Sequence, residues 1–438
     1  MTTGDYKSVL LFACKLGYQT RSFDAAARNL GIRLFYVTDR CHELTNPWGD
    51  DALAVRFDAP EHAAGRALQE FRKHHFHGIL GLGDRPAIAA SYTARGLGVA
   101  GNHPVAVEAC RNKLRMREVL RAAGLPTPWF RAMPLAPLPE PELLGLTYPC
   151  VIKPLSLSAS QGVMRADCRD ELLSGLMRLK HLFEQPDLRS QRESDFTQAL
   201  VEEYLPGAEV AVEGIVLDGE LKLLAIFDKP DPLEGPFFEE TIYVVPSRLS
   251  TDRQAAIRRT AERAIRAVGL THGPVHAEFR INEGGIWPLE IAPRPIGGLC
   301  ARSLEFRSHQ HDYLISLEEL ILRHAIGEDI SGWQREELAS GVMMIPVPFS
   351  GVFERVYGLE DAQRVRSITE VEITARLYDK ILAWPEGSSY LGFIFAKAES
   401  AKDVEDALRS AHSRLQFTIR EALPVEHPVT GKMLNSRS

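Results

Sequence analysis

The chain has 438 residues, which is too many for a single hydrophobic core and therefore predicts two to four domains. Hydrophobic residues make up 45% and charged residues 25% of the sequence, as in ordinary soluble globular proteins. The net charge of −7 gives no electrostatic reason to expect nucleic acid, and no segment approaches the ~20 apolar residues that a membrane span needs.

The cysteines and the N-terminal residues bear on the cellular setting. Six cysteines are scattered along the chain without a C-x-x-C pair, which argues against both a zinc site and a disulfide framework. The short apolar run near the N-terminus has no small-residue cleavage motif, so a first core strand is favoured over a signal peptide. We therefore expect a reduced, cytoplasmic setting.

The first hundred residues alternate between strand-like and helix-like patterns. This β-α-β rhythm predicts a parallel, doubly wound sheet. The segment Gly81–Asp84 follows a strand but is not G-x-G-x-x-G, so a tight turn is favoured over a nucleotide loop. The predicted elements are strands at Ser8–Cys14, Ile32–Val37 and Gly78–Leu82, and helices at Phe23–Leu30 and Ala63–His74.

The rest of the chain predicts a second α/β region and a final region of shorter elements. One helix is expected at Ala109–Ala123, where Gly124 ends the run, and a Pro-rich connector at Pro134–Pro141. The second region opens at Tyr148, and shorter strands and helices begin beyond about residue 335. The predicted strands are Ala199–Tyr204, Val210–Leu217, Leu221–Phe227 and Tyr390–Ala396, and the predicted helices are Leu172–Phe183, Asp252–Val268 and Ser400–Leu415.

Two adjoining stretches, Val275–Ile281 and Trp287–Ile291, alternate between apolar and polar residues as half-buried strands do. If Ile281 pairs with Trp287, Glu278 lies directly opposite Glu290, where like charges repel unless a cation sits between them. Oxygen ligands suit Mg²⁺, which commonly takes one or two carboxylates together with substrate phosphates. A candidate metal–nucleotide platform and a solvated outer face without metal remain equally open on this pattern.

Three other segments carry residues suited to a nucleotide site. Lys153 ends an apolar strand and precedes a small, hydroxyl-rich loop, Ser156–Gly162, which could cradle phosphates or be an ordinary polar turn. The acidic segment Val201–Glu209 joins two strands and could face an adenine and a ribose, or be a solvated hairpin. Arg294 follows the second acidic strand between prolines and could bind a carboxylate or phosphate, or form a capping salt bridge.

The order of these motifs is more informative than any one of them. Together they resemble the ATP-grasp enzymes, from about residue 1 to the C-terminus. The motifs that carry the resemblance are Gly98–Gly101, Asn112-Lys113, Met116-Arg117, Ala123–Pro128, Tyr148–Pro154, Val201–Glu209, the paired Glu278 and Glu290, and Arg294.

The resemblance implies an α/β fold of the ATP-grasp type in three parts. An N-terminal doubly wound, parallel-sheet domain of Rossmann type would span residues 1–110. The ATP-grasp domain would span residues 111–335, with a small lid subdomain at about 130–205. A C-terminal α+β lobe would span residues 336–438.

The resemblance also assigns roles to residues, with ATP and Mg²⁺ (or Mn²⁺) as cofactors. Glu278 and Glu290 would bind the metal. Ala292 stands where the usual Glu-x-Asn-x-Arg pattern has asparagine, so the number of Mg²⁺ ions, one or two, stays open. Arg294 would steady the reacting carboxylate or acyl phosphate. The expected nucleotide-binding residues are Lys113 and Lys153 at the phosphates, Ser156, Ser160 and Gly162 in the loop, Glu202, Glu203, Tyr204 and Leu205 around the adenine, and Glu209 at the ribose.

Within this family, Phe227–Glu240 and Gly387–Ile394 most resemble L-amino acid ligases. That likeness implies a ligase that joins a carboxylic acid and an amine, both expected to be amino acids, through an acyl phosphate. His276 is expected to stabilise the oxyanion or to deprotonate the amine, with a purely structural histidine as the alternative. No nucleic-acid or membrane partner is expected, and a homodimer is left open. A carboxylase or purine-pathway ligase and, more distantly, a non-catalytic nucleotide-binding regulator are the alternative functions.

Overall fold

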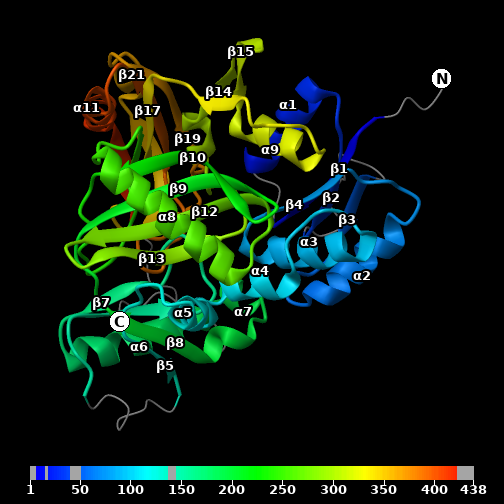
Figure 1. The fold of residues 1–438 in the computed structure, drawn as a ribbon. Helices are drawn as coiled ribbons and strands as arrows, with labels where there is room; N and C mark the ends of the chain where they lie inside the picture. The colour runs from blue at the N-terminus through cyan, green and yellow to red at the C-terminus, as the bar shows by residue number, and fades with distance from the viewer. Residues whose placement is uncertain (1–5, 15–17, 40–50, 137–144, 422–438) are drawn as a thin grey trace.

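The structure, a computed structural model, describes residues 6–14, 18–39, 51–136 and 145–421. Figure 1 shows the N-terminal part in blue at the right, a small sheet at the bottom and a large sheet above it. Among the described residues, no helix has both the length and the apolar character needed to cross a membrane.

The N-terminal part is built on a four-stranded sheet in the order β3-β2-β1-β4, in which every pair of strands is parallel. One face, which includes Leu10 and Phe12, packs against α2 and α3, while the other, which includes Leu11, packs against α1 and α9 (Leu317–Ala325). Both faces are therefore buried, and the predicted parallel α/β architecture is confirmed. The elements are β1 (Ser8–Ala13), α1 (Tyr18–Leu30), β2 (Arg33–Thr38), β3 (Ala52–Ala54), α2 (Pro60–Glu70), β4 (Gly78–Leu82) and α3 (Asp84–Leu97).

The single helix predicted at Ala109–Ala123 is wrong, because two helices, α4 (Pro104–Arg111) and α5 (Lys113–Ala122), meet at Asn112. Asn112 has an extended backbone, and its side chain accepts a hydrogen bond from the Arg115 amide, as an N-cap does. The apolar periodicity continues across the break, so the pattern alone does not reveal it. The break places Lys113 in the first turn of α5, with its amide bonded to the Leu155 carbonyl.

A second sheet, in the order β5-β8-β6-β7, is antiparallel and packs against α6. Leu172, Leu176 and Leu179 of α6 are fully buried against Ile152 and Val201 of the sheet. Residues 137–141 of the predicted connector lie outside the described residues. The elements are β5 (Phe130–Pro134), β6 (Cys150–Pro154), β7 (Met164–Ala166), α6 (Arg169–Phe183), α7 (Pro186–Arg189), the 3₁₀ turn η3 (Ser194–Thr197) and β8 (Gln198–Glu203).

The largest sheet has eight strands in the order β13-β12-β9-β10-β11-β17-β21-β19. The helix α8 covers it at one end and α11 at the other. The sheet runs across the boundary expected near residue 335, so the division into domains there remains a prediction. Its elements are β9 (Ala208–Leu217), β10 (Glu220–Lys229), β11 (Ile242–Val245), α8 (Thr251–Val268), β12 (His272–Asn282), β13 (Gly285–Ala292), β17 (Ala339–Ile345), β19 (Ile368–Ile373), β21 (Gly392–Ala398) and α11 (Ala401–His412).

Two three-stranded sheets, β15-β14-β16 and β20-β18-β22, complete the described part. Their elements, with the remaining short helices, are η4 (Cys300–Ser303), β14 (Glu305–Ser308), β15 (His311–Ser316), β16 (Trp333–Arg335), β18 (Gly351–Tyr357), α10 (Leu359–Gln363), β20 (Lys380–Ile381) and β22 (Gln416–Arg420).

Candidate active site

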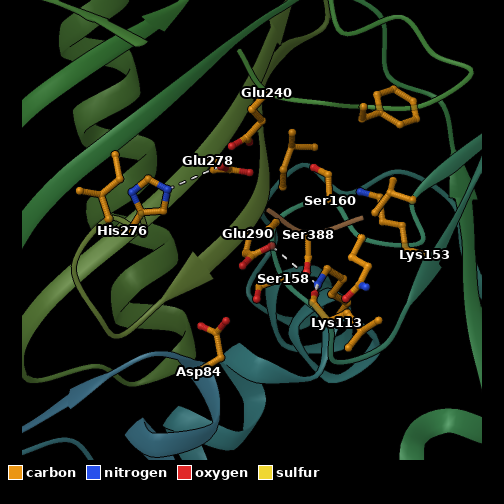
Figure 2. Close-up of a pocket in the computed structure, with 18 of the residues that line it drawn as sticks. Asp84, Lys113, Lys153, Ser158, Ser160, Glu240, His276, Glu278, Glu290 and Ser388 are labelled. Atoms are coloured by element: carbon orange, nitrogen blue, oxygen red, sulfur yellow. Dashed lines mark hydrogen bonds and ion pairs between the residues drawn. The ribbon is translucent and has the colours of Figure 1, made fainter. Parts of the chain in front are cut away.

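A cavity of about 500 Å³ lies where three sheets meet. These are the N-terminal parallel sheet, the antiparallel sheet β5-β8-β6-β7 and the eight-stranded sheet. This volume is ordinary for a small-molecule site. Figure 2 shows Lys113, Lys153 and Ser160 on one side of the cavity and Glu240, Glu278 and Glu290 facing them. The residues predicted from the sequence that line it are Lys113, Lys153, Ser156, Ser160, Glu202, Glu203, Tyr204, Leu205, Glu209, His276, Glu278, Glu290 and Arg294.

Gly162, expected in the nucleotide site, is not among the residues that line the cavity. It has φ +73°, and a Cβ placed on it would lie 2.9 Å from Cδ1 of Leu179 in α6. Its amide donates a hydrogen bond to the Pro385 carbonyl at 2.8 Å. Gly162 therefore allows the loop to approach α6 closely and makes a backbone contact with the C-terminal part.

The acidic hairpin is formed by β12 and β13, and Glu278 lies opposite Glu290 as predicted. The predicted pairing of Ile281 with Trp287 is wrong, because Ile281 pairs with Ile286 and a bulge at Leu289 then shifts the register by one residue. Leu289 consequently lines the cavity instead of joining the apolar face. Two carboxylates side by side, partly exposed to the cavity, are a donor set that suits Mg²⁺.

The two lysines expected at the phosphates approach the cavity from different elements. Lys113, in α5, donates to the Leu157 carbonyl at 2.6 Å and lies 3.7 Å from Glu290. Lys153, in β6, forms an ion pair of 2.5 Å with Glu202. Both lysines therefore border the hydroxyl-rich loop, which also contributes Ser158 and Ser160 to the cavity (Figure 2).

Glu202 is 2% exposed, and its carboxylate is held within the protein. Arg117, 1% exposed, binds both of its oxygens, at 2.8 and 3.1 Å. Burial alone would raise the pKa of Glu202, but Arg117 and Lys153 outweigh it and lower the pKa to about 2. Burial lowers the pKa of Lys153, and Glu202 counteracts that effect. The Glu202 carboxylate therefore orients Lys153. The sequence pattern did not reveal this ion pair.

Glu209, expected at the ribose, is likewise held by cations. Arg280 binds its Oε2 at 2.9 and 3.0 Å, and the Lys229 ammonium lies 2.7 Å from its Oε1. Lys229 and Arg280 were missed as site residues. The period-two pattern of β12 was the available signal for Arg280, since it places Arg280 on the same face as His276 and Glu278.

His276 lies between two carboxylates. Its Nδ1 is 3.0 Å from Oε2 of Glu213, which is completely buried, and its Nε2 is 3.6 Å from Oε1 of Glu278 (Figure 2). Burial lowers the pKa of His276, but the hydrogen bonds and charges of Glu213 and Glu278 outweigh it and raise the pKa to about 9. The imidazole therefore carries a second proton at neutral pH, which suits the stabilisation of negative charge better than proton abstraction.

Arg294 is paired with Asp84, for which the sequence pattern predicts only a place in a tight turn. Nε of Arg294 lies 2.7 Å from Oδ1 of Asp84, and its NH2 lies 3.9 Å from Glu290. Asp84 begins α3 directly after β4, at the carboxyl end of the parallel sheet, where ligands of such sheets bind. The cavity wall thus joins the N-terminal sheet to the loop that follows the acidic hairpin.

The segment 384–390 from the C-terminal part closes another side of the cavity. Trp384 donates from Nε1 to the Ala159 carbonyl at 3.1 Å, and Gln161 donates to the Glu386 carbonyl at 2.8 Å. Ser388 and Tyr390 line the cavity. The hydroxyl-rich loop is therefore hydrogen-bonded to a segment more than two hundred residues away in sequence. No local pattern predicts this contact.

Comparison with known proteins places this site in a family. Residues 146–303 match the model of the ATP-grasp domain, and residues 343–420 match that of the L-amino acid ligase C-terminal domain 2. The crystal structure of an L-amino acid ligase from Bacillus licheniformis is similar, with a TM-score of 0.78, 27% identity and coverage of 95% of this chain and 99% of that one.

Two curated relatives are similar in sequence. The uncharacterized protein y4rH of Sinorhizobium fredii is 24% identical over 330 residues, 74% of this chain and 64% of that protein, so the match spans slightly less than two thirds of its length. A D-alanine–D-alanine ligase of Gloeobacter violaceus is 32% identical over 238 residues, 52% of this chain and 72% of that protein. With the domain match and the site geometry, these likenesses show that the chain belongs to the ATP-grasp family.

Proposed function

We propose that the protein is an ATP-dependent ligase that joins the carboxylate of one amino acid to the amine of another and releases ADP and phosphate. The observation that carries the proposal is that one cavity brings together two lysines, two opposed carboxylates and the half-buried Arg294. The match of the C-terminal part to an L-amino acid ligase domain supports amino acids as the substrates. The same match argues for this chemistry over that of a carboxylase or a purine-pathway ligase.

In this proposal the nucleotide lies against the antiparallel sheet β5-β8-β6-β7. Lys113 and Lys153 bind its phosphates, together with the hydroxyls and amides of the loop at Ser156–Ser160. The backbone of residues 202–205 borders the adenine. Glu209 accepts the ribose hydroxyls, for which its Oε2 exchanges one of its two contacts with Arg280 while Oε1 keeps its contact with Lys229.

Glu278 and Glu290 would hold Mg²⁺, which Mn²⁺ can replace, and the ion would neutralise charge on the phosphates. The acid binds at Arg294, whose guanidinium is fixed by Asp84. A carboxylate oxygen of the acid attacks the γ-phosphorus of ATP, and ADP leaves. The rate enhancement then depends on positioning and on charge neutralisation by the lysines and Arg294.

The amine nitrogen next attacks the carbonyl carbon of the acyl phosphate, and inorganic phosphate departs with the proton that the nitrogen loses as the amide forms. The tetrahedral oxygen carries negative charge during this step. His276, protonated between Glu213 and Glu278, is suited to stabilise that charge. The alternative role, deprotonation of the amine, would first require the imidazole to lose its own proton.

Trapping the intermediate tests the proposal. The protein is incubated with MgATP, hydroxylamine and single amino acids, and the products are separated by mass spectrometry. We expect a hydroxamate together with ADP and phosphate for at least one acid. Release of AMP and pyrophosphate would indicate adenylation, and ATP binding without product from any acid would indicate a regulator; either result contradicts the proposal.

A further inference from the structure

Lys229, the last residue of β10, contacts three carboxylates at once. Its Nζ lies 2.7 Å from Glu209, 2.6 Å from Glu240 and 2.8 Å from Glu278. An ammonium group has three hydrogens, so each carboxylate receives one. The Lys229 side chain is only 3% exposed, so its ammonium contacts these carboxylates and not bulk water.

The three carboxylates form a cage that is held from outside as well. Arg280 binds the second oxygen of Glu209, and the Tyr243 hydroxyl donates to the second oxygen of Glu240 at 2.7 Å. One carboxylate oxygen from each of the three glutamates lies within 4.8 Å of the other two, a spacing that would suit a metal ion. The cage is therefore a preformed cation site in which the cation is the chain's own ammonium.

The position of Lys229 decides how it can act. Glu209, Glu240 and Glu278 line the cavity, whereas Lys229 is not among the lining residues and lies behind them. Lys229 thus acts through the carboxylates and not by direct contact with a ligand. Two of these carboxylates, Glu209 and Glu278, are the ones proposed above to bind the ribose and the metal.

We propose that Lys229 is a positioning residue that fixes these three carboxylates and keeps a divalent cation out of the cage, so that the metal binds only between Glu278 and Glu290. The inference rests on the proposed metal role of Glu278. Ala292, which lies opposite His276 at the end of the hairpin, has no side-chain ligand atom to draw a further ion to the other side. The ammonium supplies, permanently and within the fold, one of the two positive charges that an additional divalent ion would bring.

Metal binding without any substrate tests the inference. Purified wild type and Lys229→Met are titrated with Mn²⁺ at pH 7.5, and the free ion is measured by electron paramagnetic resonance. We expect Lys229→Met to bind one more equivalent of Mn²⁺ than the wild type. The additional equivalent should disappear in the Lys229→Met, Glu240→Gln double variant, which has only two of the three cage carboxylates.

Two further variants separate this role from general damage to the fold. Lys222→Met removes a lysine of the same strand that bonds to the Ser331 carbonyl, and it should bind Mn²⁺ as the wild type does. Lys229→Arg retains the positive charge and should not gain the additional site. Circular dichroism checks that each variant is folded, and if Lys229→Met is not, Lys229→Gln provides the same comparison with a polar side chain.

Unchanged Mn²⁺ stoichiometry in a folded Lys229→Met or Lys229→Gln protein would overturn the inference, as would an additional site in Lys222→Met or in Lys229→Arg. The measurement contains no ATP, acid or amine. Its outcome is therefore separate from that of the hydroxamate experiment, and either proposal can fail while the other stands.

Discussion

Replacement of Glu202 by glutamine should weaken the fold, because it removes the negative partner of the buried Arg117 and the half-buried Lys153. The pKa of Glu202 falls from 4.5 to about 2, since Arg117 and Lys153 outweigh the effect of burial. At about 1.4 kcal/mol per pH unit, this difference corresponds to about 3 kcal/mol of stabilisation. Loss of one partner of a buried ion pair typically costs about 3–5 kcal/mol, in agreement with that value.

Urea unfolding at pH 7, followed by circular dichroism, measures the loss. Glu203→Gln is the matched control, because Glu203 is the exposed neighbour in the same strand and its change should cost less than about 0.5 kcal/mol. The Arg117→Met, Glu202→Gln double variant should lose less than the sum of the two single variants, because their side chains are in contact.

Acid should have the same effect on the wild type. Because the folded pKa is depressed, the contribution of Glu202 is fully present above pH 4.5 and is lost as the pH falls towards 2. Two results would show that this ion-pair cluster does not hold β8 to α5. One is a free energy of unfolding of Glu202→Gln equal to that of the wild type, and the other is a loss in the double variant equal to the sum of the two single losses.

Three further predictions concern the metal, the acid stability and the hydroxyl-rich loop. Glu290→Gln should lower turnover by orders of magnitude, since a metal ion supplies several kcal/mol of charge stabilisation; wild-type turnover of the Glu278→Gln, Glu290→Gln double variant would contradict the proposed metal site. Burial, with the nearby His272, lowers the pKa of His324 from 6.5 to about 4, so the free energy of unfolding should fall by about 3 kcal/mol as the pH drops from 6.5 to 4. Urea titrations should show this slope reduced in His324→Phe; an equal slope in both proteins would refute the assignment. Trp384→Phe should accelerate hydrogen exchange in residues 156–162, because it removes the donor to Ala159, whereas Trp333→Phe should not; equal exchange in all three proteins would argue against that fastening.

Sequence alone was sufficient for the features that follow directly from the periodicity of neighbouring residues. Alternation at period two placed Val275, Ala277 and Phe279 in the core and left His276 and Glu278 facing the cavity. The strand-helix alternation of the first hundred residues predicted a parallel sheet, which the structure has. These properties follow from local periodicity, because each side chain's direction is set by its position in its own strand or helix.

Only the tertiary structure decided which distant side chains become partners. Asp84 and Arg294 are 210 residues apart, and Arg117 reaches Glu202 from 85 residues away. The bulge at Leu289 shifts the register of the hairpin by one residue, and the break at Asn112 divides one predicted helix into two. Neither change is visible in the apolar periodicity of the sequence. Which charges meet depends on how whole sheets and helices pack, and that packing is set by many weak contacts summed over the fold, not by the residues on either side of each charge.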